Sequence, residues 1–156
     1  MPKTYKKRGG KKQKTLKTLP SNLTSFSAFQ KEITIVFLET LLMIKLFHWK
    51  TTSYATHKAT DDAYAKLNIN MDGFLEILLG KSQIRTDLTN QKSIKLIDCK
   101  SQEEFVQHVK AFNGYLINLN DNKIMKSTLM TNTDLFNIRD TIVGDMNQLM
   151  YLLSFK

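Results

Sequence analysis

Residues 25–47 read SFSAFQKEITIVFLETLLMIKLF, and apolar side chains recur in this stretch at the spacing of one face of an α-helix. The repeat consists of Phe26, Phe29, Ile33, Val36, Phe37, Leu41, Ile44 and Phe47. Further apolar residues between them make the segment hydrophobic on almost every side. In a chain of 156 residues, such a helix predicts burial on more than one side and therefore contacts between copies.

Three more helices are predicted after this one. The second runs from Tyr54 to about Leu79, with Gly80 as its C-terminal stop. Residues 81–100 lack a steady period and predict a loop with a strand-like piece at 94–97. A capping-box sequence, Ser101-Gln102-Glu103-Glu104, opens a helix to about Asn120, and residues 131–134 open a last helix to about Leu153. Four helices in one domain predict an all-α four-helix bundle.

Composition and hydropathy narrow the class of protein. The chain is 42% apolar and 24% charged, as in soluble globular proteins, and its length suits one domain. One cysteine, Cys99, cannot form an intrachain disulfide. No secretory signal is visible, and the apolar run at 33–47 is too short to span a bilayer. We therefore expect an intracellular protein, in the cytoplasm or nucleoid, or a virion protein, neither secreted nor in a membrane.

Positive charge is concentrated at the N-terminus. The net charge is +9, yet the residues after position 20 carry 15 basic and 14 acidic side chains, or +1. We expect residues 1–22 to form a disordered basic tail and residues 23–156 to form the bundle. Such arms bind DNA without reading its sequence, although a targeting signal, a membrane-surface patch or a solubilising tail are alternatives. The predicted DNA-binding residues are Lys3, Lys6, Lys7, Arg8, Lys11, Lys12, Lys14 and Lys17.

Metal-binding residue types share one face of the second predicted helix. His57, Asp61, Asp72 and Glu76 fall within about 100° of arc, as two i,i+4 pairs. The pairs lie about 22 Å apart along the axis, so one chain cannot close both around one ion. A two-fold axis would set the first pair against the second pair of another chain. Mixed imidazole and carboxylate ligands suit iron, manganese or zinc.

Simpler interpretations exist for each of these residues. His57 and Asp61 fit an ordinary i,i+4 ion pair, and Asp72 with Glu76 fits a solvated acidic face. His48 and Trp49 fit a helix end and a core aromatic residue.

The run His48-Trp49, His57, Asp61, Asp72 and Glu76 resembles the ferroxidase signature of Dps, the DNA-binding protein from starved cells, within the ferritin-like superfamily. The resemblance implies a ferritin-like bundle in which His48, His57 and Asp61 of one subunit bind iron together with Asp72 and Glu76 of its two-fold mate. Trp49 would lie beside that site. Some Dps proteins also carry a lysine-rich arm that binds DNA.

Two departures from typical Dps proteins bear on function. The stretch between His48 and His57 is three residues shorter, and residues 81–100 do not predict the short helix found there. The form His48-Trp49-x-Thr51-x-Ser53-Tyr54-Ala55-x-His57-Lys58 is most similar to compact Dps-like proteins of phages and large DNA viruses.

Two functions follow as expectations. In the first, the chain forms an oligomer, at least a two-fold dimer, oxidises ferrous iron at the dimer interface, protects against oxidative stress and holds DNA with its tail. In the second, the same scaffold is a non-catalytic structural or DNA-packaging protein associated with a virion, and the tail is its active element.

Overall fold

The chain folds as an all-helical bundle, as predicted. A computed structural model describes residues 21–127 and 131–155. Within these residues the helices are α1 (Ser21–Lys50), α2 (Tyr54–Ser82), α3 (Gln102–Asn118) and α4 (Thr133–Leu152), with one 3₁₀ turn, η1 (Leu119–Asp121). Helix α1 begins two residues before the predicted domain boundary at 23. The predicted basic tail up to residue 20 lies outside the described residues.

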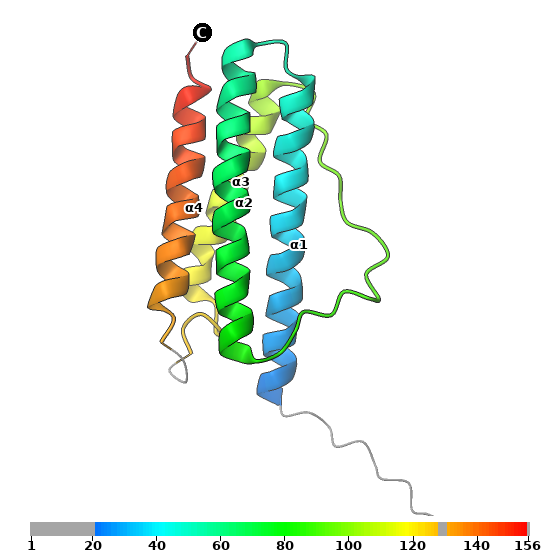
Figure 1. Ribbon diagram of the computed structural model, residues 1–156, viewed down its shortest axis with the longest axis vertical. Helices are drawn as coiled ribbons and strands as arrows, with labels where there is room; N and C mark the ends of the chain where they lie inside the picture. Colours follow the sequence, from blue (N-terminus) through cyan, green and yellow to red (C-terminus); the bar gives the residue numbers. More distant parts are fainter. Residues whose placement is uncertain (1–20, 128–130, 156) are drawn as a thin grey trace, which may run out of the picture.

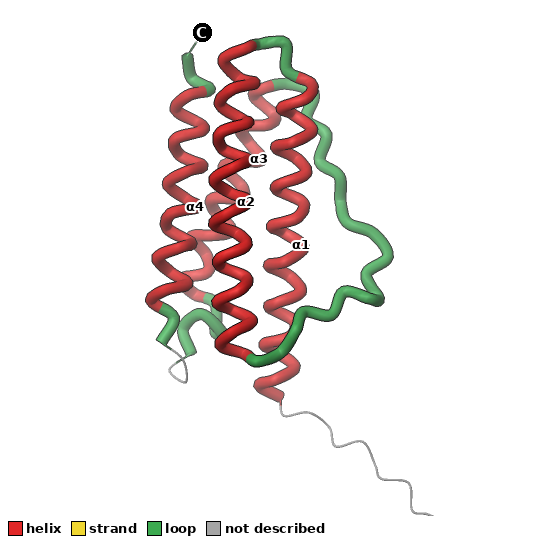
Figure 2. The backbone as a smooth tube through the Cα atoms, in the orientation of Figure 1, coloured by secondary structure: helices red, strands yellow, loops and turns green. Residues whose placement is uncertain are grey.

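The order of the helices in space follows from one long crossover. Helices α1 and α2 run antiparallel, and residues 83–101 then pass along the outside of α1 to the opposite end of the bundle (Figures 1 and 2). Helix α3 therefore runs parallel to α2, and α4 returns antiparallel to both (Figure 1). One long crossover in a four-helix bundle is the connectivity of ferritin-like folds. The predicted all-α four-helix bundle is confirmed.

Aromatic side chains fill the core between α1 and the other helices. Phe37 makes edge-to-face contacts with Phe74 of α2 and Phe112 of α3, at centroid distances of 5.5 and 6.3 Å. Near the other end of α1, Phe47 stacks on Phe105 at 4.2 Å. These contacts pack the C-terminal half of α1 against α2 and α3.

Helix boundaries follow capping chemistry, with one correction. The hydroxyl of Ser101 accepts a hydrogen bond from the Glu104 amide at 3.2 Å, so the predicted capping residue does begin α3. The prediction that Gly80 stops α2 is wrong, because the helix continues to Ser82 and Gln83 takes the left-handed conformation, with φ 55°. The additional turn is held by Lys81, which pairs with Asp134 at 3.1 Å.

The crossover is an irregular segment without helix or strand in residues 83–101, so the predicted strand-like piece at 94–97 does not form. Side chains of α1 hold it, and Gln30 Nε2 donates to the Ile84 carbonyl at 3.3 Å near its start. Glu39 accepts a hydrogen bond from the Lys95 amide at 2.8 Å, and Lys50 Nζ donates to Asp98 Oδ1 at 2.6 Å and to the Cys99 carbonyl at 3.1 Å. Cys99 is buried, and burial raises the pKa of its thiol, which keeps the sulfur protonated and poorly nucleophilic.

Two helical glycines offer a test of the fold. Gly114 in α3 and Gly144 in α4 both have open space where a Cβ would lie. Replacing both with alanine should raise the free energy of unfolding by about 1–2 kcal/mol, because alanine has the higher helix propensity. Chemical denaturation followed by circular dichroism measures this. A loss of stability would show that the Cβ positions of α3 or α4 are occupied in solution, for example by another subunit.

No helix in the described part of the chain is both long enough and apolar enough to cross a membrane.

Candidate metal site

Two histidines join the end of α1 to the start of α2. The ring of His48 stacks on that of His57 with the centroids 3.9 Å apart and the planes 24° apart. His48 Nδ1 lies 3.1 Å from the carbonyl oxygen of His57, and His57 Nδ1 lies 3.2 Å from the carbonyl oxygen of His48. Because a carbonyl oxygen only accepts, each Nδ1 carries a proton and donates it. The two residues therefore make a reciprocal pair.

This hydrogen bonding leaves the other ring nitrogens available. In a neutral imidazole with a protonated Nδ1, Nε2 is bare and can accept a proton or bind a metal. A backbone carbonyl that fixes Nδ1 in this way is the usual outer-shell partner of a metal-binding histidine. Thr60 lies against the pair. Its hydroxyl donates to the Thr56 carbonyl at 2.8 Å and lies 3.0 Å from the His57 carbonyl oxygen and 3.3 Å from His48 Nδ1.

Asp61 supplies a carboxylate beside the pair. Its Oδ1 lies 3.9 Å from His48 Nε2, and its side chain is about half exposed while that of His48 is buried. Asp61 turns toward His48 and Lys45 of α1 rather than toward His57, its i−4 neighbour. The simpler expectation of a His57–Asp61 ion pair is thus wrong. We call His48, His57 and Asp61 the histidine half-site.

Lys45, which the sequence analysis did not single out, is a second neighbour of Asp61. Lys45 Nζ lies 3.8 Å from Asp61 Oδ1. The same ammonium lies 4.7 Å from the ring centroid of Tyr64 and 5.9 Å from that of Trp49. Trp49 therefore lies near the same ammonium, but it is 68% exposed and is not a core aromatic residue.

The carboxylate half-site consists of Asp72 and Glu76, which are both exposed on α2. They lie fifteen or more residues beyond His57 on the same continuous helix, about 22 Å along its axis. One chain therefore does not bring the two half-sites together, as the sequence predicted. In the described part of the single chain, no three His, Cys, Asp or Glu side chains converge to hold a metal ion. Neither half-site alone is complete.

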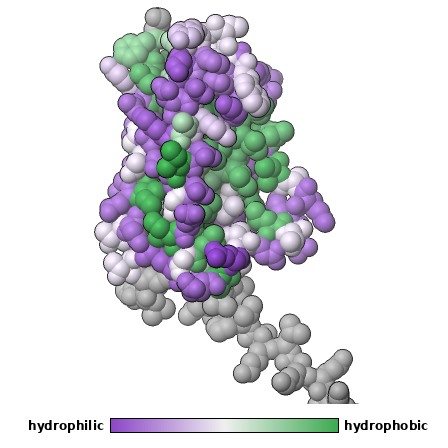
Figure 3. Space-filling view, viewed as in Figure 1, coloured by the Kyte–Doolittle hydropathy of each residue, from purple (hydrophilic) through white to green (hydrophobic). Residues whose placement is uncertain are grey.

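Exposed apolar side chains accompany the half-sites on α1. Leu38, Leu42 and Trp49 are 40%, 36% and 68% exposed, and with Lys45 they follow the i, i+4, i+7, i+11 spacing of one helix face. Lys45 contacts Asp61 and Tyr64, so this face of α1 adjoins the half-site face of α2. The space-filling view shows apolar side chains gathered over α1 beside the crossover (Figure 3). We call this combined surface the α1–α2 face.

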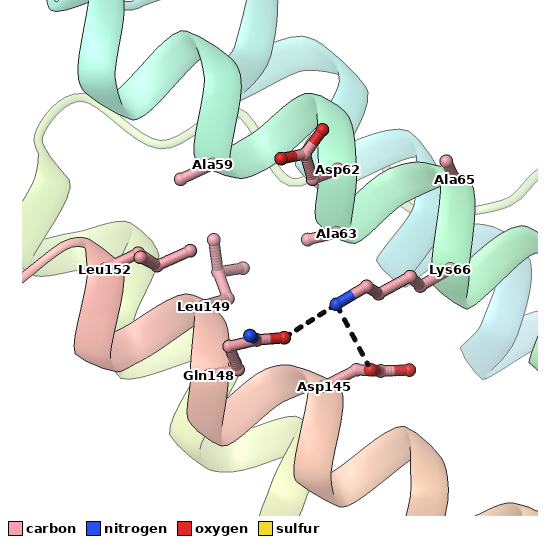
Figure 4. A pocket seen from close by; sticks show the side chains of 9 residues that line it. All are labelled: Ala59, Asp62, Ala63, Ala65, Lys66, Asp145, Gln148, Leu149 and Leu152. Carbon is pink, nitrogen blue, oxygen red and sulfur yellow. Dashed lines mark hydrogen bonds and ion pairs between the residues drawn. The ribbon is translucent and has the colours of Figure 1, made fainter.

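The described part of the chain also has hollows away from the half-sites. A groove of about 310 Å³ between α2 and α4 has a floor of Ala59 and Ala63, and Lys66 closes one end by hydrogen bonding to Gln148 at 2.6 Å (Figure 4). A second hollow, of about 200 Å³, lies between α1, α3 and the crossover and is lined in part by Glu39 and His108. None of the five predicted metal ligands lines either hollow.

The predicted DNA-binding residues, from Lys3 to Lys17, lie outside the described residues. Their role therefore stays a prediction.

The described helices form a four-helix bundle with one long crossover, and His48, His57 and Asp61 lie near the junction of α1 and α2. The chain belongs to a family of unknown function, DUF5856, whose model matches residues 48–153. The matched region begins at His48 and includes both half-sites. No curated protein matches the chain significantly, and no solved structure does so either.

Proposed function

We propose that the chain is a Dps-like mini-ferritin that binds and oxidises ferrous iron where two chains meet, and that it holds DNA with its basic tail. One observation carries the first part. Both imidazoles of the histidine half-site direct Nδ1 to backbone carbonyls, which leaves their Nε2 atoms available as metal donors, and the Nε2 of His48 lies 3.9 Å from the Asp61 carboxylate.

The donor set fits iron as a substrate. Two imidazole nitrogens and three carboxylates, counting the mate's Asp72 and Glu76, are ligands that ferrous iron accepts. His48 Nε2 and Asp61 Oδ1, at 3.9 Å, need only a small approach to share one ion at bonds of about 2.0–2.2 Å. The residues of the chain would hold the ion and leave coordination positions open to dioxygen or peroxide. Manganese or zinc would be held by the same donors.

The tail supplies the second part of the function. Eight basic side chains and no acidic ones in the first twenty residues attract a polyanion by releasing its counterions. Iron removal beside bound DNA would limit radical damage to it. The resemblance to Dps proteins and the charge distribution support this role independently.

A second candidate is a non-catalytic packaging or structural protein associated with a virion. The ion pair between Lys45 and Asp61 favours it, because an ammonium already neutralises the carboxylate that a metal would need. In this function the bundle is a scaffold and the tail binds DNA. Iron oxidation by the full-length protein separates the two candidates, because only the mini-ferritin oxidises iron.

The iron site requires a two-fold dimer, so we expect the protein to be at least dimeric through the α1–α2 face. Leu42→Glu, on this face, should dissociate the dimer because it places a charge among apolar contacts. Multi-angle light scattering measures the mass. Trp49 fluorescence should shift to longer wavelength as the ring loses its cover.

Ile117→Glu is the matched control, because Ile117 is 52% exposed on α3, away from this face. This variant should keep the mass of the unmodified protein. A monomeric unmodified protein would remove the proposed iron site altogether.

A further inference from the structure

Lys45 is held at the one carboxylate of the histidine half-site. Its Nζ lies 3.8 Å from Asp61 Oδ1, and its side chain is only 28% exposed. The ring of Tyr64 lies 4.7 Å from the same ammonium and that of Trp49 lies 5.9 Å from it. A carboxylate and two aromatic faces, all of which attract a cation, thus fix the position of the charge.

The same oxygen of Asp61 also lies near an imidazole. Asp61 Oδ1 is 3.9 Å from His48 Nε2 and 3.8 Å from Lys45 Nζ, so one oxygen is within reach of both the ring nitrogen and the ammonium. A divalent ion bonded to both His48 and Asp61 would take the charge of that oxygen and would repel the ammonium. The metal and Lys45 therefore compete for one carboxylate.

We propose, on the basis of the metal site proposed above, that Lys45 is a built-in competitor that neutralises Asp61 in the metal-free chain and must be displaced when a metal binds. In the metal-free protein, the negative charge of Asp61 is then neutralised by the Lys45 ammonium. The metal affinity of the protein is set by Lys45 as well as by the ligands. Displacement also changes the surroundings of Trp49, the only tryptophan of the chain.

Removing the ammonium tests this directly. Lys45→Met removes the charge but keeps an unbranched side chain with high helix propensity. Lys45→Gln is a second neutral variant, so the test does not depend on the folding of one protein. The full-length protein is titrated with cobalt(II), followed by calorimetry, by the visible absorption of the ion and by Trp49 fluorescence. Both variants should bind cobalt at least about tenfold more tightly than the unmodified protein.

Lys58→Met is the matched control. Lys58 lies on α2, pairs with the adjacent Asp62 at 3.9 Å and is exposed, so its loss changes the net charge equally without touching Asp61. The control should bind cobalt within about twofold of the unmodified protein, because an exposed ion pair contributes little. In the unmodified protein and this control, cobalt should change Trp49 emission. In the Lys45 variants that change should be smaller.

The outcomes separate this inference from the proposed function. Equal affinity in all proteins, lost in His57→Ala/Asp61→Ala, would overturn the competitor role and leave the metal site intact. Weaker binding by both Lys45 variants would also overturn the role, because Lys45 would then support the site. Failure of all the folded proteins, the unmodified one included, to bind cobalt would overturn the metal site and the competitor together.

Discussion

Replacing His57 and Asp61 together with alanine should abolish iron oxidation by the full-length protein. The double change removes one of the two Nε2 donors and the only carboxylate of the histidine half-site, and it leaves His48 as a single ligand. Loss of an outer-shell partner alone typically costs about 10–100-fold in metal affinity, so loss of two direct ligands should cost at least about 100-fold. Oxidation of ferrous iron is measured with dioxygen alone and with peroxide, and the metal content of the purified protein is read from the same sample.

The matched control for this experiment is Asp62→Ala/His108→Ala. It also removes one aspartate and one histidine, but Asp62 is exposed and pairs with Lys58, and His108 lies on α3 in the hollow beside the crossover. The control should oxidise iron at the rate of the unmodified protein. Asp61→Asn is a further variant that keeps the shape of the side chain, so a loss of activity in it would not reflect folding.

Absence of oxidation and of bound metal in the unmodified protein would contradict the mini-ferritin proposal. The bundle would then serve as a scaffold, with Lys45 as the permanent partner of Asp61. Equal loss of activity in the control would mean that the chemistry does not depend on the histidine half-site.

The bundle could be predicted from sequence because its signal is local. The apolar repeat of α1 and the capping residue Ser101 act within one or two turns, and both are confirmed. The end of α2 could not be predicted, because it depends on distant contacts. Lys81 pairs with Asp134 at the start of α4, and Ser82 accepts a hydrogen bond from Gln30 of α1 at 2.7 Å. These contacts extend α2 past Gly80, which fits in a helix without strain.

The site was predictable in its residue types but not in its pairings. Spacing along one helix suggests that Asp61 pairs with His57, whereas packing of α1 on α2 gives it Lys45 and His48. The role of Lys45 could not be predicted from the sequence, because a single lysine in an apolar helix is usually a solvent-exposed side chain. The only sequence indication is that Lys45 lies one turn before Trp49, and its partner is on another helix.

Removing residues 1–20 should abolish the binding of DNA by this protein. The removed segment carries eight positive charges, and the remaining residues have a net charge of only +1. If most of these charges contact phosphates, the affinity of the intact protein should fall about 10³–10⁵-fold between 50 and 200 mM salt. Gel retardation of a random duplex over a series of salt concentrations measures both the affinity and the slope.

Two variants, each lacking four positive charges, show whether DNA binds to the tail or to the body of the protein. The first replaces Lys6, Lys7, Lys11 and Lys12 of the tail with glutamine, and the second replaces the exposed body residues Lys92, Lys95, Lys110 and Lys123. The net charge is the same in both, so a difference between them reflects position alone. The tail variant should lose about three to four units of the logarithmic salt slope, because each phosphate contact contributes about 0.9. The body variant should keep its slope, and equal losses would instead assign DNA binding to the net charge of the whole protein.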